Sequence, residues 1–127
     1  MAGFFTGGAM DTKGTIEGFL GAVIDRADWI SYLDEDLVFV SATSPLKQVN
    51  GKEAALPGLK RFYSMVETMQ VRELIVEGNR GCALTRYTLQ PPGGRPQFQS
   101  DVAEIYTVGD DTITSFAIYF DTAPYPK

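Results

Sequence analysis

The 127-residue sequence contains no histidine and only one cysteine. The lack of histidine excludes the usual Ser/His and Cys/His nucleophile pairs and most histidine-based metal sites. The single cysteine, Cys82, excludes an internal disulfide, and its place in a strand pattern favours a buried, inert thiol. Acid–base chemistry would therefore come from carboxylates, tyrosine, lysine or water, and we expect neither a metal site nor a cofactor.

Long apolar runs and clusters of positive charge are also missing. No stretch of 18 apolar residues occurs, and the start, MAGFFTGGAM, lacks the basic and apolar regions of a signal peptide. The net charge of −5 and the absence of a Lys/Arg run argue against nucleic acid and an anionic membrane as partners. We therefore expect a cytoplasmic protein.

What is present is an ordinary globular composition, with 44% hydrophobic and 21% charged residues. The length suits a single core. Residues 1–10 are glycine-rich and predict a flexible N-terminal extension, and residues 11–127 predict a single domain. Helical spacing of apolar residues predicts three helices, beginning at Asp11 or Thr12, at Asp28, and at about residue 51.

The second half of the chain reads as sheet, because alternating apolar residues are separated by Gly, Pro, Asn and Asp turn signals. The expected strands cover 37–42, 70–77, 80–90, 97–108 and 112–121. The stretch TSPLKQVNG is expected to be a loop. Helices followed by a long antiparallel meander predict an α+β fold.

Two lone charges stand opposite each other in this meander. Folding the strands about Gly93-Gly94 places Arg86 directly across from Asp101, with Cβ atoms about 5 Å apart. Alternation then assigns the pair to one face of the sheet. Residues expected to share that face are Cys82, Leu84, Thr88, Ala103, Ile105, Phe116, Ile118 and Phe120.

That face is otherwise apolar, so we expect the helices to cover it. The opposite face is expected to carry Tyr87, Glu104, Tyr106 and Tyr119. A charge on a covered face must be paired or serve a function. Two interpretations of Arg86 and Asp101 remain open: a structural ion pair near the sheet edge, or a functional polar spot in a cavity.

Three segments carry a resemblance to a known superfamily: ADWISYLDEDLVFV after the first helix, NGKEA at the start of the third, and GDDTITSFAIYFD in the last strand. With these, residues 12–122 resemble the nuclear-transport-factor-2-like superfamily, which includes ketosteroid isomerase, limonene epoxide hydrolase and SnoaL-like polyketide cyclases. The resemblance implies a cystatin-like cone, in which a curved, mostly antiparallel sheet wraps around three N-terminal helices. It also implies an apolar pocket and frequent homodimers packed through the outer face of the sheet.

The catalytic residues of these relatives are not reproduced here. The resemblance to ketosteroid isomerases places Phe19, Ser41 and Ala103 at the positions of that family's catalytic Tyr and two Asp residues. None of these three side chains can perform those roles. Arg86 matches the Arg of limonene epoxide hydrolases, but Thr88 and Ile118 stand where that family has its two Asp residues. SnoaL-like cyclases commonly use Asp and His, and histidine is absent.

Three hypotheses for function follow. The first is a pocket protein that binds a small apolar ligand. The second is a cofactor-independent hydrolase, isomerase or cyclase, with Asp101 as base or electrostatic stabiliser and Arg86 lowering its pKa. The third is an interaction domain with a residual pocket. The residues expected to line the pocket are Phe19, Trp29, Ser41, Phe62, Tyr63, Leu84, Thr88, Ala103, Ile105, Phe116, Ile118 and Phe120.

We also expect a homodimer. Tyr87, Tyr106 and Tyr119 are assigned to the face away from the helices, where a monomer of this size would expose an aromatic surface to water.

Overall fold

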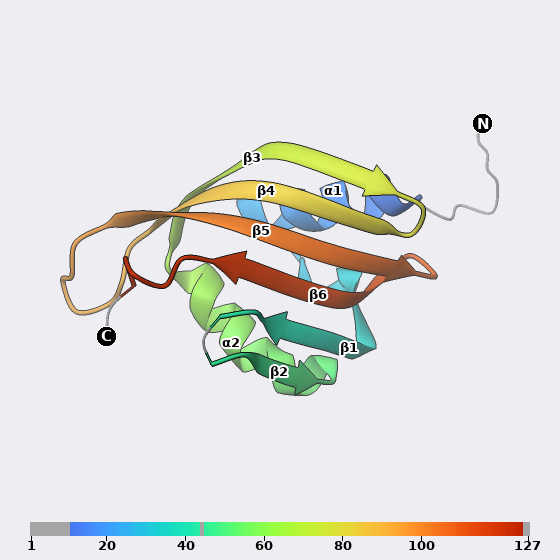
Figure 1. Cartoon of the computed structure of the whole chain (residues 1–127), viewed down its shortest axis with the longest axis horizontal. Helices are drawn as coiled ribbons and strands as arrows, with labels where there is room; N and C mark the ends of the chain where they lie inside the picture. Colours follow the sequence, from blue (N-terminus) through green and yellow to red (C-terminus); the bar gives the residue numbers. More distant parts are fainter. Residues whose placement is uncertain (1–10, 44, 126–127) are drawn as a thin grey trace.

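The computed structural model describes residues 11–43 and 45–125, so the extension expected at 1–10 lies outside the described residues. Figure 1 shows a single sheet with helices behind it. In chain order the elements are α1 (Thr12–Ile24), the 3₁₀ helix η1 (Ile30–Tyr32), β1 (Leu33–Ser41), β2 (Lys47–Asn50), α2 (Lys52–Ser64), β3 (Val66–Glu77), β4 (Arg80–Leu89), β5 (Phe98–Gly109) and β6 (Thr112–Phe120).

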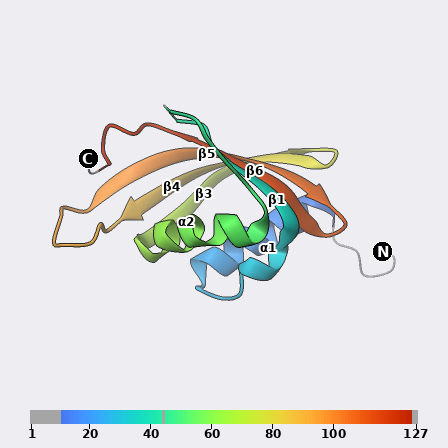
Figure 2. The ribbon, with the colours of Figure 1, turned by 90° about the horizontal axis from the view of Figure 1, so that it is seen from below.

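The six strands form one sheet in the order β2-β1-β6-β5-β4-β3. All neighbours are antiparallel except β1 and β6, which are parallel. The sheet is open and curved, and both α-helices lie on its concave side (Figure 2). The expected α+β class and mixed, mostly antiparallel sheet are therefore confirmed.

The expectation of three helices is wrong for the described residues, which form two α-helices and one 3₁₀ turn. The side chain of Asp28 accepts a hydrogen bond from Ser31 N at 3.2 Å, as expected for a cap, but only one turn follows. Leu33 then enters β1 with its side chain buried. Burial of Leu33 in the sheet therefore ends the helical segment early.

The segment expected to be a loop contains a further strand. β2 pairs with β1 from Val38↔Asn50 to Ser41↔Lys47. β2 is an edge strand of only four residues, and its burial does not alternate clearly. The sequence therefore gives no strand pattern here, and the neighbouring Pro and Asn-Gly turn signals dominate. The pairing of β2 places Lys47 at one end of the sheet.

Helix α1 begins where the sequence predicts, with the side chain of Asp11 accepting from Gly14 N at 2.6 Å. Two glycines, one in α1 and one facing it on β4, are explained by close packing. A Cβ at Gly18 would lie 2.7 Å from the hydroxyl of Tyr32, and a Cβ at Gly81 on β4 would lie 2.5 Å from Cδ1 of Ile16. Glycine at these two positions lets the helix approach η1 and the sheet, which offsets its low helix propensity.

The core between α1 and the sheet is aromatic. Phe19 is fully buried and packs edge-on against the rings of Tyr106 and Phe116, with centroids 5.9 Å and 5.8 Å away. Trp29 and Tyr63 pack against its other side. Trp29, which is half-buried, packs against this core.

A β-bulge in β6 sets which residues face the helices. At the turn, Gly109 pairs with Thr112 and Val108 with Ile113, but the next pair is Thr107↔Ser115, so Thr114 is the extra residue. From there on, Phe116 lies opposite Tyr106. The bulge therefore puts the apolar residues of β6 on the same face as Tyr106, not on the face of Ile105.

Candidate functional site: a buried carboxyl in an aromatic pocket

A pocket of about 270 Å³ lies on the concave side of the sheet, between α2 and strands β1, β2, β4, β5 and β6. Aromatic and aliphatic side chains form most of its wall, and Glu104 is the one acidic residue among the described residues that line it. The lining residues are Phe39, Ser41, Lys47, Gly58, Leu59, Arg61, Phe62, Tyr63, Tyr87, Val102, Glu104, Phe116, Ile118, Phe120 and Tyr125. Small-molecule sites typically have this composition, a mostly apolar wall with few polar groups.

Glu104 on β5 is 1% exposed and is held by three hydroxyl groups. Thr85 Oγ1 donates to Glu104 Oε2 at 2.8 Å, the hydroxyl of Tyr87 donates to the same oxygen, and the hydroxyl of Tyr106 donates to Oε1. We refer to Glu104, Thr85, Tyr87 and Tyr106 as the carboxyl cradle. All four belong to the inner face of the sheet, where their side chains are buried.

The strand pairing explains why the cradle forms. Glu104 lies opposite Ala83, whose small side chain takes little space on this face. Thr85 is the diagonal neighbour on β4, Tyr87 is two residues further on, and Tyr106 is two residues beyond Glu104 on its own strand. Diagonal neighbours on one face are close enough for long side chains to meet. A period of two therefore brings the three hydroxyls to one carboxyl group.

Burial raises the pKa of Glu104, and the hydrogen bonds from Tyr106, Tyr87 and Thr85 partly oppose this rise. Within the described part of the chain, no Lys or Arg forms an ion pair with its carboxylate. The pKa values of Tyr87 and Tyr106 are also raised well above 10. Burial is the larger cause, and the negative charge of Glu104 adds to it. The two phenols are therefore neutral donors over the physiological pH range.

One acceptor position of the carboxylate stays open. An ionised carboxylate has about four lone-pair sites, and the three hydroxyls occupy two on Oε2 and one on Oε1. Tyr63 on α2 also lines the pocket, and no hydrogen bond of its hydroxyl is found among residues 11–43 and 45–125. Burial and Glu104 raise the pKa of Tyr63 well above 10, so it is a neutral donor too. The site thus offers one acceptor and one donor inside an apolar wall.

The C-terminal segment adds to the wall. The ring centroid of Tyr125 lies 4.9 Å from those of both Phe98 and Phe120, and its hydroxyl donates to Ser100 Oγ at 2.8 Å. These contacts hold the segment after β6 against the end of the sheet where β6 terminates.

Of the residues expected to line the pocket, six do so: Ser41, Phe62, Tyr63, Phe116, Ile118 and Phe120. Phe19 and Trp29 lie in the adjoining core, where Trp29 packs on Tyr63 with ring centroids 4.9 Å apart. The remaining four expected lining residues are on the outer face, namely Leu84, Thr88, Ala103 and Ile105. The prediction that they line the pocket is wrong.

Arg86 and Asp101 form the expected ion pair, but on the outer face. Arg86 Nε and Nη2 donate to Asp101 Oδ1 and Oδ2 at 2.8 Å and 3.1 Å, and 61% of the Asp101 side chain is exposed. The hydrogen bond from Arg86 lowers the pKa of Asp101. The register was predicted correctly, whereas the face was wrong because the bulge at Thr114 shifts β6 by one residue. The pair therefore does not border the concave pocket.

The residues that carry the site are not those predicted from the sequence. Alternation along the strands predicted Glu104, Tyr87 and Tyr106 on the outer face, whereas all three are buried beneath the helices. On β4 the side chains of two alternating sets face opposite sides of the sheet. The buried set is Ala83, Thr85, Tyr87 and Leu89, and the set between them is Leu84, Arg86 and Thr88. An acidic residue between Val102 and Tyr106 on the buried face was the available signal.

A larger but more open depression of about 540 Å³ lies on the outer face, with Leu84, Asp101 and Tyr119 in its wall. We place the functional site in the smaller concave pocket, because only there is a carboxyl group buried among aromatic rings. Within the described ranges, no group of three or more His, Cys, Asp and Glu residues is placed to hold a metal ion. No helix among these residues has the length and apolar character needed to cross a membrane.

The fold and the pocket define a nuclear-transport-factor-2-like α+β domain. The sequence model of the SnoaL-like domain matches residues 21–116, and the chain belongs to this family. No curated protein sequence matches the chain.

Solved structures share the fold at low sequence identity. A candidate SnoaL-like polyketide cyclase from Mesorhizobium loti is 19% identical, with a TM-score of 0.73 over 87% of this chain and 99% of that one. An LEH-like epoxide hydrolase of M. tuberculosis is 21% identical, with a TM-score of 0.72 over 90% and 85%. TerC, co-crystallised with polyporic acid, is 17% identical, with a TM-score of 0.74 over 90% and 94%.

Proposed function

We propose that the chain binds a small, mostly apolar molecule in the concave pocket, with a hydroxyl or similar donor of the ligand directed at Glu104. The observation that carries this proposal is the buried Glu104 carboxyl within an aromatic wall. Burial of an ionisable group is unfavourable unless its hydrogen bonds are satisfied. A ligand donor would fill the acceptor position that the carboxyl cradle leaves open on Oε1.

A test uses N-phenyl-1-naphthylamine, an uncharged dye whose fluorescence rises in apolar surroundings. Gly58 lines the pocket, and a Cβ there meets no atom within 4 Å, so Gly58→Phe is expected to fill pocket space without backbone strain. Gly21→Phe is the matched control, since Gly21 is also helical, has equally open space and lies outside the pocket lining.

We expect wild type and Gly21→Phe to bind the dye alike, and Gly58→Phe to bind at least about tenfold more weakly, or ~1.4 kcal/mol. Equal binding by all three proteins, or no binding by wild type, would overturn the proposal.

A second candidate is a cofactor-independent enzyme in which Glu104 transfers a proton. A carboxyl group with a raised pKa suits general acid–base catalysis near neutral pH, and the free hydroxyl of Tyr63 is available to a ligand oxygen. In this candidate, Glu104 takes the catalytic role that the sequence suggested for Asp101 and Arg86, which lie on the outer face. The relatives described as a cyclase and an epoxide hydrolase support an enzyme only through their shared fold.

Proton abstraction can be measured without knowing the substrate. Deuterium exchange at the activated α-carbon of 2-tetralone, followed by NMR, needs only a base and a donor to the ketone oxygen. We expect exchange above the buffer rate for wild type and Asp101→Asn, and a loss of about 10²-fold or more for Glu104→Gln. Exchange at the buffer rate in wild type would contradict catalysis of this type and leave the binding proposal standing.

We also propose that the chain forms a homodimer through the outer face of the sheet. The reason first given fails, because Tyr87 and Tyr106 are buried beneath the helices. Support comes instead from three large side chains on this face, Ile75, Leu84 and Tyr119, which are 54%, 37% and 48% exposed. Sedimentation equilibrium should give a dimer for wild type and a monomer for Leu84→Glu; a wild-type monomer at high micromolar concentration would refute the proposal.

A further inference from the structure

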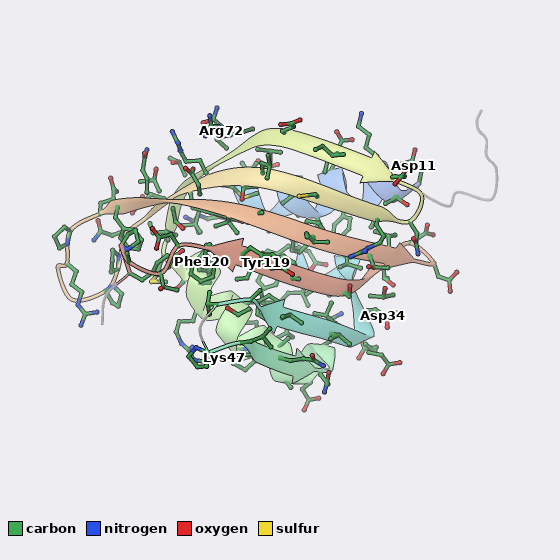
Figure 3. All side chains as sticks on the ribbon, in the orientation of Figure 1. Asp11, Asp34, Lys47, Arg72, Tyr119 and Phe120 are labelled. Carbon is green, nitrogen blue, oxygen red and sulfur yellow. The ribbon has the colours of Figure 1, made fainter. Side chains whose placement is uncertain are left out.

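Two positive charges stand at the mouth of the concave pocket. Lys47 begins β2, and Arg61 lies in the last turn of α2. Both line the pocket and both are exposed, in contrast to the buried Glu104. Figure 3 shows Lys47 at the end of the sheet where β6 ends with Phe120, away from the opposite end, near which Asp11 and Asp34 lie.

Neither cation has an ion-pair partner in the part of the chain that the structure describes. Among residues 11–43 and 45–125, the ion pairs join Lys52 to Glu35 and Arg86 to Asp101, so Lys47 and Arg61 have no acidic partner within ion-pair distance. The chain as a whole carries a net charge of −5. Among the described residues that line the pocket, cations outnumber acidic groups, with Lys47 and Arg61 against Glu104.

The polar groups of the pocket thus differ between its interior and its mouth. The interior offers the open acceptor of Glu104 and the donor of Tyr63, while the exposed mouth offers an ammonium and a guanidinium group. An ammonium and a planar guanidinium are the side chains that bind carboxylates and similar anions. The apolar wall lies between these two polar regions.

We propose that the ligand of this pocket is an apolar organic acid, whose anionic group is bound at the mouth by Lys47 and Arg61. The inference rests on the proposed binding function and narrows it from apolar molecules in general to amphipathic anions. The two cations act as ligand-binding residues in this account. Arg61 also lies where a cation stabilises the C-terminal end of α2, so its variant is assessed for stability as well as binding.

The test compares two dyes with one carbon skeleton. 1-Anilinonaphthalene-8-sulfonate carries a sulfonate, and N-phenyl-1-naphthylamine lacks it. Both are titrated into wild type and into Lys47→Gln/Arg61→Gln. The control is Lys13→Gln/Arg80→Gln, which removes the same formal charge from two residues outside the pocket lining. Thermal melts of all three proteins show whether the fold is kept.

We expect wild type to bind the sulfonate more tightly than the uncharged dye. The Lys47/Arg61 variant should lose about fivefold to tenfold in affinity for the sulfonate and less than about twofold for the uncharged dye. The Lys13/Arg80 control should match wild type with both dyes. Raising the salt concentration should weaken the binding of the sulfonate dye but not of the uncharged dye. This salt effect should occur only in proteins that keep Lys47 and Arg61.

The outcomes separate this inference from the one on which it rests. Failure of both dyes to bind would overturn the binding function itself. Binding of the uncharged dye with no preference for the sulfonate, or an equal loss in the two double variants, would overturn the anion proposal and leave the binding function intact. If the Lys47/Arg61 variant melts early, the single variant Lys47→Gln, which leaves α2 unchanged, must still lower sulfonate affinity for the proposal to stand.

Discussion

Tyr106 and Phe116 lie directly opposite each other on β5 and β6, with their rings stacked 4.7 Å apart at an angle of 20°. This pairing exists because Thr114 is an extra residue in β6. Without it, alternation would turn Phe116, Ile118 and Phe120 to the outer face. The wall of the concave pocket therefore depends on a single residue far from its centre.

Deletion of Thr114 is expected to abolish the native fold. The deletion would continue the register of the turn along β6 and expose three apolar side chains that now line the pocket. Thr114→Ala keeps the residue count and loses only the bond from Thr114 Oγ1 to Thr107 O, which is 3.2 Å long. We expect the alanine variant to unfold cooperatively with a loss of about 1 kcal/mol. A deletion variant that melts like wild type would contradict this role of the bulge.

Glu104→Gln should change how stability depends on pH. Burial raises the pKa of Glu104, so the folded chain keeps its proton over a pH range in which the unfolded chain has lost it. The free energy of unfolding that this group contributes is thus full below its ordinary pKa of 4.5 in the unfolded chain and falls as pH rises through the folded pKa. Urea melts at several pH values should show wild type losing stability relative to Glu104→Gln from about pH 4 upward. A difference that stays constant with pH would mean that the pKa is not raised.

Tyr106→Phe removes the single hydroxyl that binds Glu104 Oε1. Above the folded pKa of Glu104 we expect a loss of about 1–3 kcal/mol, because a buried carboxylate oxygen is left without its donor. The loss should shrink at low pH, where the carboxyl is neutral in both states. Tyr119→Phe is the control, since Tyr119 is 48% exposed on the outer face, and its effect should stay within about 0.5 kcal/mol. Equal losses would argue that the cradle contributes no specific stabilisation.

Asp101→Asn should leave the pocket unchanged. The Arg86–Asp101 pair is exposed on the outer face, so its loss is screened by water and reaches neither Glu104 nor the aromatic wall. Binding of N-phenyl-1-naphthylamine should remain within a factor of about two of wild type. A large loss of binding would indicate that the outer face communicates with the pocket.

Much of the fold follows from local sequence patterns, and the site depends on one feature that those patterns do not show. The cap at Asp11, the four long strands and the pairing of Arg86 with Asp101 are all readable from spacing and turn residues. The bulge at Thr114 is not, because the TITS segment contains no Gly or Pro to mark it. This one extra residue reverses the predicted assignment of the two faces. For that reason the sequence pattern indicates Asp101 as the pocket carboxyl, whereas the structure has Glu104 there.

The most direct test of the account is a ¹³C NMR titration of the Glu104 side-chain carboxyl, with and without bound N-phenyl-1-naphthylamine. The account predicts that the pKa of Glu104 lies above its ordinary value of 4.5 in the free protein. It also predicts that the carboxyl resonance moves when the dye binds, because Glu104 lines the occupied pocket. A Glu104 pKa at or below 4.5, together with a carboxyl resonance that does not shift when the dye binds, would contradict the central claim that Glu104 is the polar centre of a ligand site.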